Sequence, residues 1–156
     1  YIQGRIFSFF NRETGTHNFQ SDKAIESITS GGFFGKGIGE GVLKNRVPEA
    51  HTDYIISVIS EEFGVVAIML ILLLFLILIY MVFKKISFET NDKVKLILIG
   101  SISLILMQAT IHIGVNIRLF PTTGMTLPFL SYGGSSIIST SILGGIILNL
   151  TKRKIT

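Results

Sequence analysis

The sequence contains no cysteine and no tryptophan. Without cysteine the chain forms no disulfide, and cysteine usage gives no information on its redox compartment. Without tryptophan, any aromatic belt at a membrane interface has to use tyrosine and phenylalanine. A stripe of basic and aromatic residues is also absent, because the basic residues flank apolar blocks. We therefore exclude nucleic acid as a partner despite the net charge of +4.

The chain also lacks an initiating methionine and begins at Tyr1, in a polar stretch with no basic-then-apolar signal segment before it. We expect it to be a fragment without its N-terminal part, since three membrane helices alone would make a thin bundle with little interior.

The apolar residues gather in blocks that are long enough to cross a bilayer. Overall, 48% of the residues are hydrophobic and the mean hydropathy is +0.60. Soluble domains also reach nearly half apolar residues, so this fraction alone decides little. The distribution is more informative, because about 20 residues span the hydrocarbon core. It predicts an all-α polytopic membrane protein with transmembrane helices at 54–84, 94–117 and 131–150. The segments between them are an outer loop at 1–53, an inner loop at 85–93, an outer turn or re-entrant segment at 118–130 and a basic tail at 151–156.

The charges predict the orientation of these helices. Residues 84–95, around the inner loop, and the tail at 152–154 together hold seven of the fourteen basic residues. The positive-inside rule makes that side cytoplasmic, including the C-terminus, and puts residues 1–53 and 118–128 outside. No nucleoside triphosphate is available there, so an activated substrate must carry its own leaving group, and a lipid-linked substrate fits best.

A dense glycine run, Gly31-Gly32-Phe33-Phe34-Gly35-Lys36-Gly37-Ile38-Gly39-Glu40-Gly41, interrupts the outer loop. It resembles a nucleotide loop only in part, because no strand precedes it and the third glycine is misplaced. A flexible loop is the favoured interpretation. Ala24, Ile25 and Ile28 before it predict one short amphipathic turn.

The polar stretch 47–54 lies directly before the first apolar block and is the main site hypothesis, with Asp53 at its centre. The alternative is that Asp53 only caps the following helix. Glu61 and Glu62 come next, and at least one of them should face protein or water, because acids facing lipid are costly. The alternative is that both side chains extend out to the level of the lipid headgroups.

Further polar residues lie inside or beside the predicted membrane helices. Gln108, His112 and Asn116 are spaced by four residues and share one helix face. Hydrogen bonding between helices is favoured for them over proton transfer by His112. Pro121 and Pro128 prevent helix continuation in the outer turn. The candidate cavity-lining residues are Glu61, Glu62, Gln108, His112, Asn116, Ser131 and Ser135.

Four passages give the chain a specific resemblance. They are Tyr1-Ile2-Gln3-Gly4-Arg5-Ile6 with Phe19-Gln20-Ser21, the glycine run, Pro48-Glu49-Ala50-His51-Thr52-Asp53-Tyr54 with Glu61-Glu62-Phe63-Gly64, and Pro121-Thr122-Thr123-Gly124-Met125-Thr126-Leu127-Pro128-Phe129 with Ser131-Tyr132-Gly133-Gly134-Ser135-Ser136. The chain resembles the C-terminal part of a SEDS protein (shape, elongation, division and sporulation), of the FtsW, RodA and SpoVE class. The fourth passage is closer to the division members than to the elongation members. Arg118 departs from the family, which more often has a small residue there.

The resemblance implies a ten-helix fold in the bacterial cytoplasmic membrane, with residues 1–53 as the loop before helix eight. It also implies a peptidoglycan glycosyltransferase that polymerises lipid II, with a class B penicillin-binding protein and divisome proteins as partners. The family's essential loop aspartate falls on Asp53, our candidate general base. A divalent cation, Mg²⁺ or Mn²⁺, is a candidate cofactor, although no ligand spacing demands one. Candidates for supporting Asp53, contacting substrate or holding pyrophosphate are Glu49, His51, Thr52, Lys44, Arg46 and Arg5.

Two other functions fit the same pattern. A lipid II flippase would use the polar residues of the membrane helices, but has no clear need for a carboxylate fixed outside. A non-catalytic scaffold for a penicillin-binding protein would not depend on Asp53 for synthesis. We do not expect the fragment to polymerise glycan alone, because the donor cavity should need the missing helices.

Overall fold

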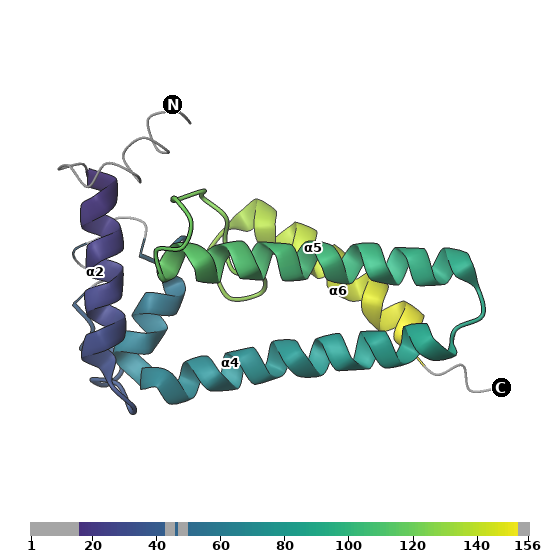
Figure 1. Cartoon of the computed structure of the whole chain (residues 1–156), viewed down its shortest axis with the longest axis horizontal. Helices are drawn as coiled ribbons and strands as arrows, with labels where there is room; N and C mark the ends of the chain where they lie inside the picture. The colour runs from purple at the N-terminus through teal and green to yellow at the C-terminus, as the bar shows by residue number, and fades with distance from the viewer. Residues whose placement is uncertain (1–15, 43–45, 47–49, 153–156) are drawn as a thin grey trace.

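The computed structural model describes residues 16–42, 46 and 50–152. These residues form four helices and no strand: α2 (Thr16–Gly31), α4 (Ile55–Phe88), α5 (Asp92–Asn116) and α6 (Gly134–Thr151) (Figure 1). The three later helices are long and apolar enough to cross a membrane, with 34, 25 and 18 residues. The structure therefore confirms the predicted all-α membrane fold.

The membrane helices end at slightly different places than the sequence predicts. Helix α4 continues past the lysine pair to Phe88, and its last turn includes a 3.0 Å ion pair between Lys85 and Glu89. The inner connection is therefore only residues 89–91, and the Asn91 side chain caps α5 by accepting a hydrogen bond from the Lys93 backbone at 3.1 Å. At the other end, α6 begins at Gly134 instead of residue 131, because Ser131 still belongs to the preceding turn.

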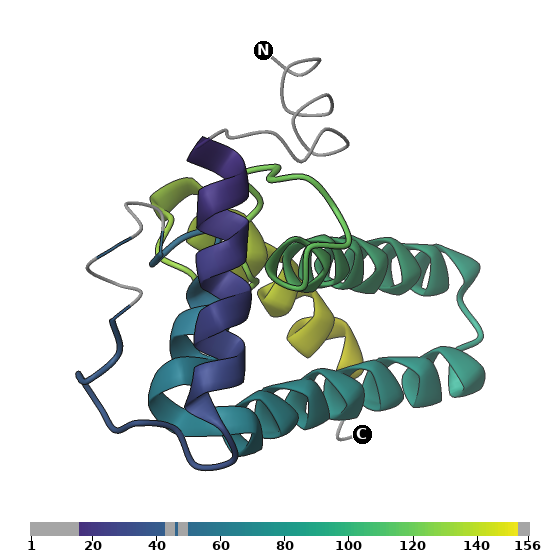
Figure 2. The same ribbon diagram turned by 60° about the vertical axis from the view of Figure 1, so that its left-hand side comes forward.

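Helix α2 is the largest departure from the sequence prediction. A single short amphipathic turn was expected, and this was wrong, because α2 has 16 residues. It lies across one end of the membrane helices, at a steep angle to α5 and the long part of α4 (Figures 1 and 2). A small apolar cluster joins it to the beginning of α4 and the end of α5, and consists of Ala24, Ala50, Tyr54, Val58 and Val115.

Helix α4 is bent at Gly64, which has non-helical dihedral angles (φ 78°, ψ −175°). The bend divides α4 into a short arm, residues 55–63, and a long arm, residues 65–88. The short arm runs beside α2, and the long arm runs along α5 (Figures 1 and 2). The sequence predicted a helix at 54–84 without indicating this bend.

The long arm packs against α5 and α6 through an apolar cluster built on Val82, Leu98, Ile102, Ile105 and Ile147. Many of the remaining leucines and isoleucines of α4 are exposed, as expected for side chains that face lipid. The 89–91 connection and the end of α6 lie at one end of these helices, which we call the inner end (Figure 1). Helix α2 and the turn between α5 and α6 lie at the other end (Figure 1), which we call the outer end.

Candidate functional site

The glycine loop, residues 32–41, fills the break in α4. In a continuous helix the backbone N–H groups of Val65 and Val66 would donate to the carbonyls of Glu61 and Glu62. The bend removes both bonds. Val65 donates instead to Gly32 at 3.0 Å, and Val66 donates to Phe33 at 3.4 Å.

The two carbonyls left over in the short arm are satisfied by the same loop. Glu61 accepts from the Lys36 backbone at 2.8 Å, and Glu62 accepts from the Gly37 backbone at 3.1 Å. Since unpaired backbone groups are costly when buried, the loop and the bend depend on each other. The loop therefore holds α2 on the short arm of α4.

Three glycines allow this close approach. A Cβ on Gly31 would lie 2.0 Å from the Ser60 carbonyl oxygen, and one on Gly35 would lie 2.2 Å from the Glu62 oxygen. A Cβ on Gly64 would lie 2.2 Å from the Phe33 oxygen. Gly35 and Gly64 also have φ of +78°, which favours glycine.

Residues 51–54 lie at the outer end, between the end of α5 and the turn that follows it. The Thr52 carbonyl accepts from Ser131 Oγ at 2.9 Å and faces His112 Nε2 at 3.2 Å. A carbonyl only accepts, so His112 carries a proton on Nε2 in this contact. The His51 carbonyl accepts from the Tyr132 backbone at 3.1 Å. The candidate motif is therefore positioned through its backbone.

Asn116 makes the most extensive of these contacts. Its Nδ2 donates to the Asp53 carbonyl at 2.8 Å and to the His112 carbonyl at 2.9 Å. Its Oδ1 accepts from Ser57 Oγ at 2.7 Å and from the Ser57 backbone at 3.2 Å. Asn116 is fully buried, so these bonds are formed away from solvent and define one arrangement of the motif against α5.

Asp53 itself is buried, with 6% of its surface exposed. Tyr54 occupies the N-cap position of α4 and makes no capping side-chain hydrogen bond, so Asp53 does not stand at the cap as the alternative interpretation required. Tyr54 is fully buried, and its hydroxyl lies 3.2 Å from Ser21 Oγ of α2. Asp53 is thus fixed between α2, α4 and α5.

The turn between α5 and α6 is also tied to this end of α5. Gln108 Nε2 donates to the Thr126 carbonyl at 3.0 Å and to Ser136 Oγ at 3.1 Å. Ser131 Oγ accepts from the Leu127 backbone at 2.8 Å. The polar face of α5 is thus used for hydrogen bonds between segments, as the sequence interpretation favoured.

The structure brings some of the predicted site residues together and leaves others apart. Thr52, Asp53, His112, Asn116 and Ser131 form one connected network. His51 and Ser135 are exposed, and Glu62 is half-buried. Three supporting candidates, Arg5, Lys44 and Glu49, lie outside the described residues.

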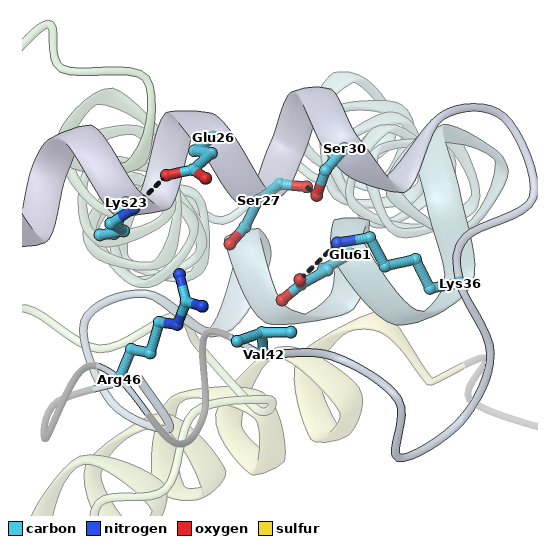
Figure 3. A pocket seen from close by; sticks show the side chains of 8 residues that line it. All are labelled: Lys23, Glu26, Ser27, Ser30, Lys36, Val42, Arg46 and Glu61. Carbon is cyan, nitrogen blue, oxygen red and sulfur yellow. Dashed lines mark hydrogen bonds and ion pairs between the residues drawn. The ribbon is translucent and has the colours of Figure 1, made fainter.

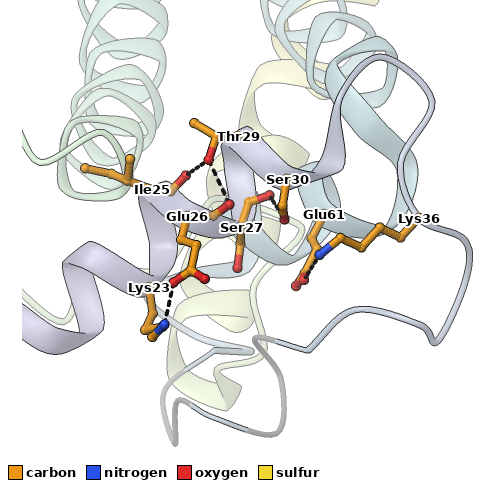
Figure 4. A network of polar contacts seen from close by, with 8 residues as sticks. All are labelled: Lys23, Ile25, Glu26, Ser27, Thr29, Ser30, Lys36 and Glu61. Carbon is orange, nitrogen blue, oxygen red and sulfur yellow. Dashed lines mark hydrogen bonds and ion pairs between the residues drawn. The ribbon is translucent and has the colours of Figure 1, made fainter.

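A second polar feature lies beneath α2, where a pocket of about 200 Å³ opens beside the short arm of α4 (Figure 3). Glu61 is 2% exposed and forms a 2.9 Å ion pair with Lys36 of the glycine loop. Lys23 and Glu26 form a second pair on α2 (Figure 4). The pocket is lined by Lys23, Glu26, Ser27, Ser30, Lys36, Val42, Arg46 and Glu61.

The charges in this pocket act on one another. The hydrogen bond and the charge of Lys23 hold the pKa of Glu26 below its usual value, and the charges of Arg46 and Lys36 lower it further. Glu26 is therefore ionised at neutral pH. Arg46 makes no hydrogen bond or ion pair with another described residue, and its side chain points toward α2 (Figure 3).

Sequence reasoning missed most of this pocket. Lys36 and Glu61 are 25 residues apart, and no periodic pattern connects them. The single usable signal was the acid pair Glu61-Glu62 before an apolar block, which required a partner. Ser57, the partner of Asn116, was not among the predicted site residues.

Fold and site together define a polytopic membrane protein with a hydrogen-bonded polar site at one end of its spans. Residues 1–155 match the model of the FtsW, RodA and SpoVE family, described as a cell cycle protein. The chain belongs to this family, as its motifs predicted.

Curated relatives support this assignment. The chain is 40% identical over 138 residues to the "Probable peptidoglycan glycosyltransferase FtsW" of Enterococcus hirae, covering 88% of this chain and 35% of the relative. Proteins of the same name are 38% identical in Caulobacter vibrioides, covering 99% and 39%, and 41% identical in Francisella salina, covering 96% and 39%. The chain thus spans about two fifths of the length of these relatives.

Proposed function

We propose that the protein containing this chain is a peptidoglycan glycosyltransferase that polymerises lipid II at the outer face of the bacterial cytoplasmic membrane. The observation that carries the proposal is the fixing of Asp53 at the outer end by the Asn116 network, in a chain whose relatives are named peptidoglycan glycosyltransferases. A class B penicillin-binding protein and divisome proteins are the proposed partners. The lysines at the opposite end support a cytoplasmic C-terminus.

The proposed chemistry is one glycosyl transfer. An acceptor sugar hydroxyl attacks the anomeric carbon of a lipid-linked donor, a new C–O bond forms, and the bond to the lipid pyrophosphate breaks with its electron pair on oxygen. Asp53 accepts the hydroxyl proton as general base. The hydrogen bonds to the backbone of Thr52 and Asp53 limit the movement of this carboxylate, which favours a productive geometry.

A divalent cation, Mg²⁺ or Mn²⁺, is also proposed for the pyrophosphate. Among the residues that the structure describes, no three histidine, aspartate or glutamate side chains gather as a metal site. The pyrophosphate would therefore provide most of the ligands, with Asp53 as the protein's candidate ligand. Bound there, the cation would neutralise the charge of the leaving group.

The test uses a chimera in which this chain replaces the corresponding part of the Caulobacter relative, purified with its penicillin-binding protein partner. Asp53→Asn keeps the size of the side chain and removes the base. We expect polymerisation of lipid II to fall by at least about 10²-fold, the usual contribution of a general base. Asp92→Asn, at the exposed first turn of α5, is the matched control and should leave the rate unchanged.

Partner binding and expression are measured on the same samples. Loss of product with an intact complex supports the glycosyltransferase. Full polymerisation by Asp53→Asn would reject Asp53 as the base. If the unsubstituted chimera does not polymerise lipid II but still transports it, the result would favour the flippase. If it does not polymerise lipid II but still binds the partner, the result would favour the scaffold.

A further inference from the structure

We propose that the pocket beneath α2 binds a carboxylate of the lipid II stem peptide, with Arg46 as its main ligand. The proposal rests on the glycosyltransferase function above and assigns a part of the same substrate to a second site. It is carried by the charges, the size and the position of the pocket.

The charges favour a group with one negative charge. Among the described residues that line the pocket, three cationic side chains face two carboxylates, which leaves a formal charge of +1. Lys23 is paired with Glu26, and Lys36 is paired with Glu61, so both acids already have partners. Among the described residues the guanidinium of Arg46 is then the cation left for a ligand. A carboxylate matches it in charge and in planar, two-pronged geometry.

A pyrophosphate fits this pocket less well. It brings two negative charges close to Glu26 and Glu61, whose own cations are used internally. The hydroxyl of Ser30 donates to the Ser27 carbonyl at 3.1 Å, so in this arrangement it has no proton to donate to an anion. The pocket thus offers the Arg46 guanidinium to a single carboxylate, and unfavourable charges to a more highly charged anion.

The size and position also indicate part of a substrate. About 200 Å³ is below the roughly 300–1,000 Å³ of sites for whole drug-sized ligands, so a short peptide end fits and a disaccharide does not. Asp53 lies in the turn just before α4, and Glu61 is six residues beyond Ile55, where α4 begins, or roughly 9 Å along the helix at 1.5 Å per residue. An extended peptide covers about 3.5 Å per residue, so a stem peptide of a few residues is long enough to reach from the site at Asp53 toward the pocket.

The buried Glu61 gives the pocket a fixed wall. It is held by Lys36, and its backbone carbonyl is held by the glycine loop. The same contacts fix the bend in α4. Binding of a stem peptide against this wall would therefore select substrates by their peptide without touching the reacting sugars, which makes Arg46 a specificity residue and not a catalytic one.

The experiment compares two substrates in the chimera. One is lipid II with its complete stem peptide, and the other is the same lipid-linked disaccharide without peptide. We expect Arg46→Gln to raise KM for complete lipid II about tenfold with little change in kcat, as for the loss of one charge-assisted contact. KM for the peptide-free substrate should not change, and Arg46→Lys should restore part of the affinity. Lys93→Gln, an exposed lysine at the inner end, is the control.

Binding of fluorescent lipid II in an Asp53→Asn background gives a readout that does not need catalysis. The same tenfold weakening, confined to the peptide-bearing lipid, is expected there. An equal effect on both substrates would overturn the proposal in favour of pyrophosphate binding. Unchanged KM and unchanged binding would show that the pocket takes no part in substrate recognition, whether or not Asp53 proves to be the base.

Discussion

The two ends of the helical bundle differ in how much buried polar contact supplements their apolar packing. At the inner end and along the spans, α4, α5 and α6 pack through Val82, Leu98, Ile102, Ile105 and Ile147. At the outer end the buried residues include Asp53, Ser57, Glu61, His112 and Asn116, each in a polar contact.

This difference has a physical reason. Apolar side chains of membrane helices gain little from leaving lipid, so their packing depends on shape and tolerates similar side chains. Buried polar groups lose stability when one partner is removed, because the other partner is left unsatisfied. The outer end therefore has one favoured geometry, and the spans support it. Substitutions that introduce a steric clash, remove a hydrogen bond or add backbone strain should therefore affect stability and activity more at the outer end than along the spans.

The largest effect is expected in the glycine loop. Gly35→Ala introduces a Cβ 2.2 Å from the Glu62 carbonyl oxygen at a residue with φ of +78°. The loop then loses its hydrogen bonds to the bend in α4. We expect the free energy of unfolding to fall by on the order of 3 kcal/mol or more, together with loss of polymerisation. Thermal melting of the chimera in detergent and the rate of glycan synthesis measure the two effects.

Substitutions at two neighbouring glycines separate the steric clash from the backbone strain. Gly31→Ala places a Cβ 2.0 Å from the Ser60 oxygen, and Gly31 lies within a helix, so this variant tests the clash alone. Gly32→Ala, at φ of +59° with nothing within 4 Å, tests the backbone strain alone and should cost about 1 kcal/mol. If Gly31→Ala, Gly32→Ala and Gly35→Ala all have the same melting temperature, the loop is not held on α4 as described.

An intermediate effect is expected at Asn116. Asn116→Ala removes the bonds to the Asp53 carbonyl and to Ser57, and should destabilise the outer end by about 2–3 kcal/mol and slow polymerisation. Ile105→Val is the matched change in the spans, where a fully buried side chain loses one methylene and about 1 kcal/mol.

Activity and stability should respond differently in these two variants. Asn116→Ala should lower kcat at temperatures where the chimera is still folded, because Asp53 loses its fixed position. Ile105→Val should change melting and leave kcat within about twofold, an effect below 0.5 kcal/mol. Equal kcat values for both variants would contradict the division of the chain into two differently held regions.

The sequence predicted the spans better than the outer end. Apolar blocks of membrane length predict helices from composition alone, and the three helices were found. The four-residue spacing of Gln108, His112 and Asn116 predicted a shared face, since helical periodicity is local. The family followed from motifs, and the membrane class followed from the apolar blocks.

The outer end depends on contacts that no local pattern reveals. The bend at Gly64 exists because a loop 25 to 33 residues earlier supplies hydrogen bonds, and the length of α2 depends on packing against the short arm. A glycine between an acid pair and an apolar block is a weak signal for such a bend. The pocket joins residues of α2, the glycine loop and α4, so its existence required the fold.

The smallest effect is expected at Arg118, at the end of α5. Arg118 follows the C-cap residue Ile117 and has φ of +60°. Its N–H donates to the Val115 carbonyl at 3.1 Å and the Leu119 N–H donates to Gly114 at 2.7 Å, the Schellman pattern in which glycine is usual. Its side chain pairs with Asp22 of α2.

Arg118 therefore has two opposing effects on stability: its positive φ destabilises the fold, and its ion pair with Asp22 stabilises it. Arg118→Gly removes about 1 kcal/mol of backbone strain and also an exposed ion pair worth about 0–1 kcal/mol, so melting should change little. Arg118→Ala loses the pair and keeps the strain, and Asp22→Asn loses the pair alone, so both should melt slightly lower than the unsubstituted chimera. A large loss of stability in Arg118→Gly would mean that the ion pair, and not the backbone network around Asn116, holds α2 on the end of α5.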